Sequence, residues 1–356
     1  MAQEETKRKH IVFLYTELAA YTLACLKKLE KKAVDIHVFR WPVNKEAPFD
    51  FNFSEKIKVY DRHDYSRNEL LDLVKNIQPD LIYCSGWIDK HYLTICSFFK
   101  TKIPIIVGFD NQWKGSVKQV MASFLNKILV RKYFTHAWIP GDAQKKFAHK
   151  LGFKAHEIIT GVYSADTDLF ESYYLQNKTE KEQNLPHRFI YMGRYVEWKG
   201  INELWEAFKL LGEERKDWEL WCVGTGEMYE NRLEIPGLVH KGFIQPDELK
   251  EIMTTTSVFI LPSKFEPWGV ALHEFAAAGF PLICTSEVGA SSAFLNEGEN
   301  GWYIKSGDVN SIYDTFKKVI ATSDEDLVKF GKRSRELAKL CTTDMWAETI
   351  FNLCAE

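Results

Sequence analysis

The chain has 356 residues, of which 46% are hydrophobic and 27% are charged, with a net charge of −3. This composition excludes an intrinsically disordered chain and leaves room for about two domains. The polar start MAQEETKRKH lacks the apolar core of a signal peptide, and we expect no membrane-spanning segment. The seven cysteines are scattered without C-x-x-C spacing, so we expect free thiols in a reducing cytoplasm and no metal site.

The small net charge hides an asymmetry between the two halves of the chain. Residues 1–170 hold 26 Lys and Arg against 19 Asp and Glu, whereas the remainder holds 20 against 30. A basic first half favours an acidic partner such as a phosphorylated lipid, an anionic membrane surface or a charged glycan. Ordinary surface variation is the alternative. The acidic second half argues against nucleic-acid binding.

Short apolar runs alternate with helical patterns along the chain, and this alternation predicts an α/β fold with parallel sheets. The first five predicted strands are His10–Tyr15, Val34–Phe39, Asp80–Cys84, Ile103–Phe109 and Ala137–Pro140. Five more are predicted at Phe189–Gly193, Glu219–Val223, Ser257–Leu261, Pro281–Thr285 and Gly301–Ile304.

The alternation pauses once, at the polar stretch 171–188, which reads as a linker or surface excursion. We therefore predict a first domain over residues 1–170 and a second over residues 171–341. Both are expected to be doubly wound.

Several residues suited to ligand binding follow the predicted strands of the second half. Ligands of open α/β sheets bind beyond the carboxyl ends of the strands, so these residues should lie together. They comprise Gly193, Arg194 and Lys199 in GRYVEWKG, the loop Gly224-Thr225-Gly226, and Glu266, Gly269, Val270 and Glu274 in FEPWGVALHE.

This set suits a nucleotide-diphosphate sugar. Arg194 and Lys199 supply positive charge for a diphosphate, and the helix that Gly269 and Val270 open offers N–H groups and a favourable dipole. A carboxylate at Glu274 suits ribose hydroxyls, and one at Glu266 suits sugar hydroxyls.

Two other ligand classes fit poorly. The Gly224-Thr225-Gly226 loop lacks the third glycine of a dinucleotide fingerprint. His273-Glu274 starts an H-E-x-x-H pattern, but Ala277 stands where a zinc protease needs histidine.

Taken together, GRYVEWKG, VGTGE and FEPWGVALHEFAAAGFPLICT resemble the retaining glycosyltransferases of family 4, with Glu266 and Glu274 as that family's E-x7-E pair. The resemblance implies a GT-B fold, in which two Rossmann-like domains face a cleft. It also implies a helix near residues 342–356 that packs back on the first domain.

The resemblance further implies a role for each residue. Arg194 and Lys199 would bind the diphosphate and stabilise the leaving group, Glu274 would bind the ribose, and Glu266 would lie beside the donor sugar. No metal or other cofactor is expected, because the cations and the helix dipole replace it. The reaction would retain the anomeric configuration, either by front-face attack or with Glu266 as nucleophile.

The first half departs from the family's pattern. The first predicted strand is followed by TELAAY without the usual glycine pair, and Phe109-Asp110 stands where many members have His-Asp. Asp110 is our candidate for contacting the acceptor or the sugar, with Asn111 and Trp113 beside it. A loop-capping aspartate is the alternative.

One segment of the first half has a different pattern. Apolar residues at 117, 120, 121, 124, 125, 128 and 129 form a helical stripe, flanked by Lys114, Lys118, Lys127, Arg131 and Lys132. A core-facing helix with a basic outer face is one interpretation. A peripheral contact with an anionic membrane is the other.

The sequence therefore predicts a cytoplasmic glycosyltransferase, at the inner face of the membrane if the basic helix binds lipid. A UDP-sugar is the favoured donor and a GDP-sugar the second choice, with a glycan or lipid-linked acceptor in cell-surface polysaccharide or glycolipid synthesis. Two alternatives stay open, namely a nucleotide-sugar epimerase and a non-catalytic GT-B-like subunit.

Overall fold

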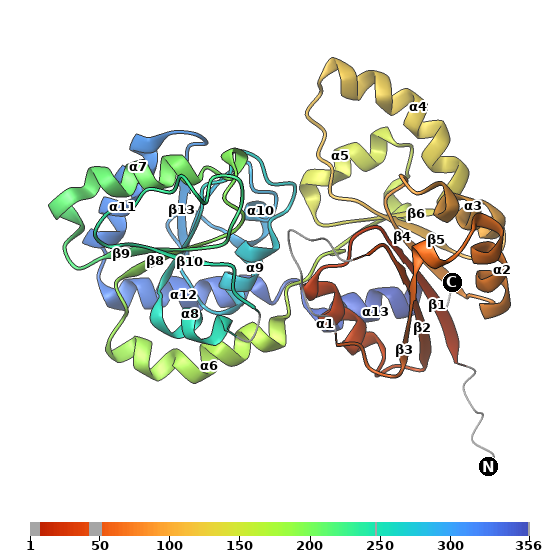
Figure 1. Cartoon of the computed structure of the whole chain (residues 1–356), viewed down its shortest axis with the longest axis horizontal. Coiled ribbons are helices and arrows are strands. Elements are labelled where there is room, and N and C mark those ends of the chain that lie inside the picture. The colour runs from red at the N-terminus through yellow and green to blue at the C-terminus, as the bar shows by residue number, and fades with distance from the viewer. Residues whose placement is uncertain (1–7, 43–51, 246–247, 355–356) are drawn as a thin grey trace, which may run out of the picture. The chain divides into compact units, whose positions relative to one another are not determined.

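The computed structural model describes residues 8–42, 52–245 and 248–354. The chain folds into two compact units (Figure 1). Unit 1 comprises Met1–Ser164 and Thr343–Glu356, and unit 2 comprises Ala165–Thr342. The chain thus passes from unit 1 to unit 2 after Ser164 rather than after residue 170, and it returns after Thr342.

The described part of unit 1 contains a parallel sheet of seven strands in the order β3-β2-β1-β4-β5-β6-β7. The strands are β1 (Lys9–Tyr15), β2 (Val34–Arg40), β3 (Ile57–Asp61), β4 (Leu81–Ser85), β5 (Ile105–Gly108), β6 (His136–Ile139) and β7 (Ile158–Thr160). Its helices are α1 (Ala20–Leu29), α2 (Arg67–Ile77), α3 (Lys90–Phe99), α4 (Val117–Tyr133), α5 (Asp142–Lys150) and α13 (Thr343–Leu353), with short turns η1 (Arg62–Asp64) and η2 (Ala155–Glu157).

Side chains alternate between the two faces of this sheet, and each face is buried in its own apolar cluster. Val12 and Leu14 of β1 pack with residues of α2, α3 and α5, whereas Ile11 and Phe13 pack with residues of α1 and α13. This burial on both faces explains why the central strands are continuous apolar runs.

The last helix, α13, completes the second of these clusters. The Trp346 ring stacks on that of Trp138 with a centroid separation of 5.0 Å, and its indole N–H donates to the Val162 carbonyl at 3.0 Å. Lys28 of α1 also pairs with Asp344 at 2.6 Å. The end of the chain is therefore an integral part of unit 1.

The described part of unit 2 contains a parallel sheet of six strands in the order β10-β9-β8-β11-β12-β13. The strands are β8 (Arg188–Met192), β9 (Glu219–Val223), β10 (Leu238–Gly242), β11 (Val258–Leu261), β12 (Leu282–Thr285) and β13 (Gly301–Ile304). Its helices are α6 (Thr167–Gln183), α7 (Ile201–Leu211), α8 (Leu249–Thr255), α9 (Val270–Ala277), α10 (Ser291–Phe294), α11 (Val309–Ala321) and α12 (Asp324–Ala338), with turns η3 (Glu197–Lys199) and η4 (Gly212–Arg215).

Three strands of the two sheets were not predicted from the sequence: β3 and β7 of unit 1 and β10 of unit 2. Each lies at an edge of its sheet, and most of its side chains are only partly buried. An edge strand does not need a continuous apolar run, so IKVYD, IIT and LVHKG lack the pattern that identifies buried strands.

The predicted linker over residues 171–188 is wrong, because most of it belongs to helix α6 of unit 2. Asp166 caps this helix by accepting from the Leu169 N–H at 3.2 Å. Phe170, Tyr173 and Asn177 are its buried face. The other side chains are largely polar, because the opposite face of the helix lies in solvent.

The burial of side chains on helix α4 contradicts one of the two interpretations of its sequence. Ser123 and Val130 are buried, whereas Val117, Met121 and Ile128 are 75%, 68% and 75% exposed. Val120 and Leu129 are exposed too, and the side chains of Lys118, Phe124 and Leu125 lie outside the description. For its described members, the interpretation that the apolar stripe faces the core is wrong.

No helix in the described ranges is long and apolar enough to cross a bilayer. The fold as a whole is that of two parallel α/β units, as the strand–helix alternation predicts. The cleft expected between the units stays a prediction.

Candidate donor site in unit 2

The predicted donor residues lie beyond the carboxyl ends of β8, β9 and β11, which are neighbours in the sheet. Arg194 follows β8, Gly224 follows β9, and Glu266 and Gly269 follow β11. The chain therefore brings these segments to one edge of unit 2, as ligand sites of open α/β sheets require.

Two glycine-bearing loops interlock at this edge. The Gly193 N–H donates to the Val223 carbonyl at 3.0 Å, and the Tyr195 N–H donates to the Thr225 carbonyl at 2.9 Å. Gly224 has φ +133°, and a Cβ there would lie 2.0 Å from the Gly193 oxygen. Only glycine permits this approach, which leaves the backbone of both loops at the surface of the site.

Lys199 and Glu266 form an ion pair across the site, and each side chain is 16% exposed. The backbone of Glu266 is held on both sides, because its N–H donates to the Glu287 carbonyl at 3.2 Å and its carbonyl accepts from Gly289 at 3.1 Å. Lys199 ends turn η3, where Gly200 packs so closely on Pro262 that a Cβ would lie 2.2 Å from the Pro262 oxygen.

Arg194 is anchored by its backbone and exposed at its side chain. The buried Tyr191 hydroxyl donates to the Arg194 carbonyl at 2.8 Å. The guanidinium lies over the ring of Trp198, 5.7 Å from the ring centroid. Arg194 and Lys199 thus flank Trp198, an indole that is 45% exposed and that sequence reasoning did not single out.

Helix α9 begins at this edge without a side-chain cap. Gly269 precedes it with φ +92°, and a Cβ there would lie 2.9 Å from the Glu266 side chain. The first turn of α9 therefore keeps its N–H groups and positive dipole end next to Glu266 and its partner Lys199. This combination of N–H donors and cations suits a phosphate.

Glu274 lies partway along α9 and is partly buried. Burial raises its pKa to about 7, and the nearby Asp166 carboxylate adds to this effect. A carboxylate in such surroundings is stabilised when the hydroxyl groups of a ligand donate hydrogen bonds to it.

His273, which precedes Glu274, has a structural role. Its ring is fully buried, Nδ1 accepts from the Ala165 N–H at 3.1 Å, and Nε2 donates to the Ala338 carbonyl at 3.0 Å. Burial lowers its pKa to about 4, so the ring is neutral at physiological pH. Backbone groups occupy both ring nitrogens, so His273 is not part of a metal site.

Asp110 belongs to unit 1, in the loop that follows β5. Its carbonyl accepts from the Gln144 amide at 3.2 Å. Burial raises the pKa values of Tyr83 and Tyr163, and the negative charge of Asp110 adds a smaller contribution. Trp113 stacks on Phe147 with a centroid separation of 6.3 Å, so one face of its indole is already covered. The role of Asp110 stays a prediction.

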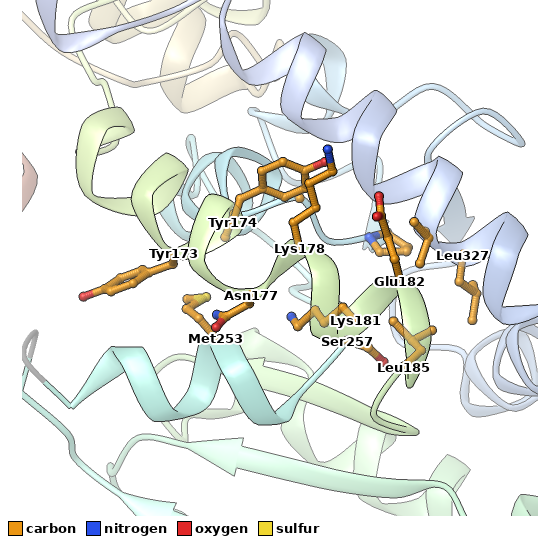
Figure 2. Close-up of a pocket in the computed structure, with 14 residues that line it drawn as sticks. Tyr173, Tyr174, Asn177, Lys178, Lys181, Glu182, Leu185, Met253, Ser257 and Leu327 are labelled. Atoms are coloured by element: carbon orange, nitrogen blue, oxygen red, sulfur yellow. The ribbon is translucent and has the colours of Figure 1, made fainter.

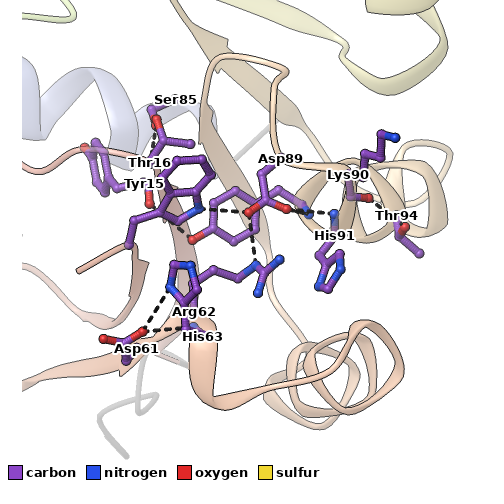
Figure 3. Close-up of polar contacts among 12 residues, drawn as sticks. Tyr15, Thr16, Asp61, Arg62, His63, Ser85, Asp89, Lys90, His91 and Thr94 are labelled. Carbon is purple, nitrogen blue, oxygen red and sulfur yellow. Dashed lines mark hydrogen bonds and ion pairs between the residues drawn. The ribbon is translucent and has the colours of Figure 1, made fainter.

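A polar cluster surrounds Asp89 at the carboxyl edge of the unit 1 sheet, the edge where Asp110 also lies (Figure 3). This cluster was not predicted from the sequence. The carboxylate accepts from Trp41 Nε1 at 2.8 Å, Arg62 Nε at 3.0 Å, and the N–H groups of His91 and Tyr92 at 2.7 and 3.2 Å. Burial alone would raise its pKa, but these hydrogen bonds and Arg62 lower it. Trp41, Arg62 and Asp89 are dispersed in the chain, so no local motif reveals them.

Comparison with known proteins identifies similar sequences and folds. Residues 176–337 match the family described as glycosyl transferases group 1. The chain is 27% identical to the capsular polysaccharide biosynthesis glycosyltransferase CapM of Staphylococcus aureus. The matched region covers 90% of each chain. The chain is also 31% identical to the lipopolysaccharide core biosynthesis glycosyltransferase LpsE of Rhizobium meliloti, over 36% of this chain and only 38% of LpsE.

Solved structures show the fold. HepE of Anabaena, determined with UDP and glucose, superposes with a TM-score of 0.71 at 13% identity, over 98% of this chain and all of that one. Sucrose-phosphate synthase of Thermosynechococcus elongatus gives a TM-score of 0.72 at 16% identity, over 97% and 98% of the two chains. The chain therefore has the GT-B fold, and its residues 176–337 are similar to the glycosyl transferases group 1 family.

Proposed function

We propose that this protein is a retaining glycosyltransferase of the family-4 type. It transfers a sugar from a nucleotide-diphosphate sugar to a hydroxyl of a glycan or lipid-linked acceptor. The observation that carries this proposal is the convergence of Lys199, Glu266, Arg194 and the uncapped start of α9 at one sheet edge. A UDP-sugar is the preferred donor, since HepE was determined with UDP and the fold is shared.

In this proposal the nucleoside diphosphate is the leaving group, and its negative charge grows as the bond to the anomeric carbon breaks. Arg194 and Lys199 stabilise that charge together with the N–H groups that open α9. Glu274 accepts hydrogen bonds from the ribose. Gly193 and Gly224 hold the two loops together, because a side chain at Gly224 would collide with the Gly193 oxygen.

Glu266 changes partner when the donor binds. In the free protein its carboxylate neutralises Lys199. A diphosphate competes for Lys199, which releases Glu266 toward the hydroxyl groups of the donor sugar. The acceptor hydroxyl attacks the same face that the diphosphate leaves, and its proton passes to the departing phosphate. Asp110 is the unit 1 residue proposed to contact the acceptor or sugar.

The test is a thermal-shift screen of UDP-, GDP- and ADP-sugars against the wild type, Arg194→Ala and Lys199→Ala. A ligand at 100 times its dissociation constant stabilises the folded state by about 2.7 kcal/mol, which raises Tm by several degrees. Lys209→Ala, on the exposed face of α7, is the matched control. Stabilisation by no nucleotide sugar, or equal stabilisation of all four proteins, contradicts the donor site.

Two further measurements test the finer parts of the proposal. Product analysis by NMR should show the anomeric configuration of the donor, and an inverted product contradicts retention. Transfer should also persist in EDTA, because protein cations and the helix start replace a divalent ion. Strict dependence on added Mg²⁺ or Mn²⁺ contradicts the metal-independent scheme.

We also propose that α4 binds an anionic membrane that carries the acceptor or its lipid carrier. The exposed apolar side chains Val117, Met121 and Ile128 share their helix with the exposed Lys127 and Lys132. Helix α4 contains no acidic residue, so its charge complements anionic headgroups. This contact would hold the protein at the cytoplasmic face of the membrane, where cell-surface polysaccharides or glycolipids are assembled.

Co-sedimentation with vesicles tests the α4 proposal. The wild type should sediment with vesicles that contain phosphatidylglycerol and less with pure phosphatidylcholine, and Met121→Asp with Ile128→Asp should remain in solution. Leu175→Asp, an exposed apolar position on α6 of unit 2, should behave as the wild type. Equal sedimentation of the α4 variant contradicts the contact.

A further inference from the structure

Figure 2 shows a pocket in unit 2 that is lined largely by helix α6 and by residues that precede two strands of the sheet. Ser257 and Pro281, which line it, precede strands β11 and β12, so the pocket lies at the amino edge of the sheet. The donor residues occupy the carboxyl edge. The donor chemistry therefore does not use the residues that line this pocket.

The walls of the pocket are mostly apolar. Leu185, Met253, Ala278 and Leu327 are all at least nine-tenths buried. The enclosed volume is about 30 Å³, which is enough for a water molecule or a small substituent on a lining side chain. Helix α6 closes one side and contributes both Lys178 and Lys181.

Lys181 is the unusual member of this lining. Its Nζ lies 3.9 Å from the centroid of the buried Phe280 ring. Lys178 and Lys181 leave α6 in different directions, with the Lys181 amine on the side of Asn177 and Met253 (Figure 2). Lys178 is exposed, whereas Lys181 is partly buried against the apolar wall.

No carboxylate in the described ranges forms an ion pair with Lys181. Glu182, the acidic residue of the pocket lining, instead pairs with Lys332 at 2.8 Å. Burial lowers the pKa of Lys181 to about 7, and the Glu180 charge opposes this only in part. A far larger share of the Lys181 side chains than of ordinary lysines is therefore a neutral, nucleophilic amine at pH 7.

We propose that Lys181 is a covalent modification site for small activated acyl groups, with acyl phosphates as the donor class. The Nζ lone pair attacks the acyl carbon, the C–N bond forms, and the bond from that carbon to the phosphate oxygen breaks. Phosphate departs with the electron pair, and the amine proton passes to water. The resulting amide is neutral, so it suits the apolar pocket better than an ammonium ion does.

Acetyl phosphate is the probe, applied to the full-length protein and read by mass spectrometry at each lysine. Lys181 should be acetylated on the order of ten times faster than Lys178 at pH 7. Its rate should level off above pH 7 to 8, whereas the rate of an ordinary lysine rises toward about pH 10. In 8 M urea the two rates should become equal, because the fold creates the difference.

Lys181→Arg and Lys178→Arg are the matched variants. Lys181→Arg should remove the fast-reacting site and leave Lys178 unchanged, and Lys178→Arg should leave the fast site in place. Labelling of Lys181 at or below the rate of Lys178 in the folded protein overturns the proposal. Equal pH profiles for the two lysines overturn it as well. These outcomes are independent of donor binding, so they do not depend on the proposed transferase activity.

Discussion

The Lys199 ammonium and the Glu266 carboxylate form an ion pair that joins turn η3 to the loop after β11. The two residues are far apart in sequence, and both sit at the edge where a diphosphate is proposed to bind. The pair holds the cation in place, and a bound donor must exchange one anionic partner of Lys199 for another.

Substitutions at this pair should separate binding from chemistry. Lys199→Ala should lower kcat by about 10²–10³ through loss of a contact to developing charge. Glu266→Gln should bind UDP at least as tightly as the wild type, because Lys199 loses its competing anion, while transfer falls. Calorimetric titration of UDP and initial rates measure the two effects. Weaker UDP binding by Glu266→Gln would contradict the exchange of partners.

The pKa of Glu274, raised to about 7, predicts a pH-dependent affinity for the nucleotide. A carboxylate is the better acceptor for ribose hydroxyls, so UDP affinity should increase several-fold between pH 6 and pH 8. Glu274→Gln should bind more weakly at pH 8 and lose this dependence. Titration of UDP at several pH values measures it, and a flat wild-type profile would count against Glu274 as the ribose ligand.

Glu274 also predicts a change in stability with pH. Its folded pKa lies above the usual value of 4.5, so the folded protein holds this proton more tightly. Its contribution to stability is complete below pH 4.5 and is lost as the pH rises through about 7. Chemical unfolding of Glu274→Gln should therefore show a smaller loss of stability across this range than unfolding of the wild type.

His187 predicts a second contribution to stability that is lost as the pH rises. Partial burial alone would lower its pKa, but hydrogen bonds to Asp324 at 3.0 Å and Asp217 at 2.6 Å raise it. The pair contributes stability below the unfolded pKa of 6.5, and this contribution is lost as the pH rises through the higher folded value. Because the group is partly exposed, His187→Gln should cost only about 0.5–1 kcal/mol at pH 6 and less at pH 9. Urea unfolding at the two pH values checks this, and an equal cost at both would contradict it.

Gly224→Ala should disrupt the interlocked loops of the donor site. The added Cβ would lie 2.0 Å from the Gly193 oxygen, and φ is +133°. Gly298, with φ +77° and nothing within 4 Å of an added Cβ, is the matched control. Gly298→Ala should cost about 1 kcal/mol for its backbone alone, and Gly224→Ala at least about 2 kcal/mol with loss of UDP binding. Similar unfolding free energies for the two variants would show that the loops can separate.

Much of the architecture was predictable because buried parallel strands are continuous apolar runs. Glu219–Val223 and the edge strand Gly301–Ile304 have the predicted bounds, and the other predicted strands differ by one or two residues at their ends. The three edge strands β3, β7 and β10 and helix α6 escaped prediction for a common reason. Their side chains face solvent on one side, so the local pattern resembles that of a loop.

The donor site was predictable in part because its residues follow strands that are neighbours in one sheet. Topology alone brings the ends of β8, β9 and β11 together, so the positions of Arg194, Gly224 and Glu266 follow from strand order. The pairing of Lys199 with Glu266 and the contact of Arg194 with Trp198 depend on loop conformation, which no period in the sequence encodes.

The sequence by itself determined the α/β class, the central strands, and the residues gathered at the carboxyl edge of unit 2. Only the tertiary structure decided that the described apolar residues of the α4 stripe are exposed and that Asp89 accepts hydrogen bonds from Trp41 and Arg62. It also decided that Lys181 lies in an apolar pocket without an ion pair to any described carboxylate. Apolar periodicity reports that a face is buried against something. Which neighbour covers it, and which charge meets which, depends on contacts between segments far apart in the chain.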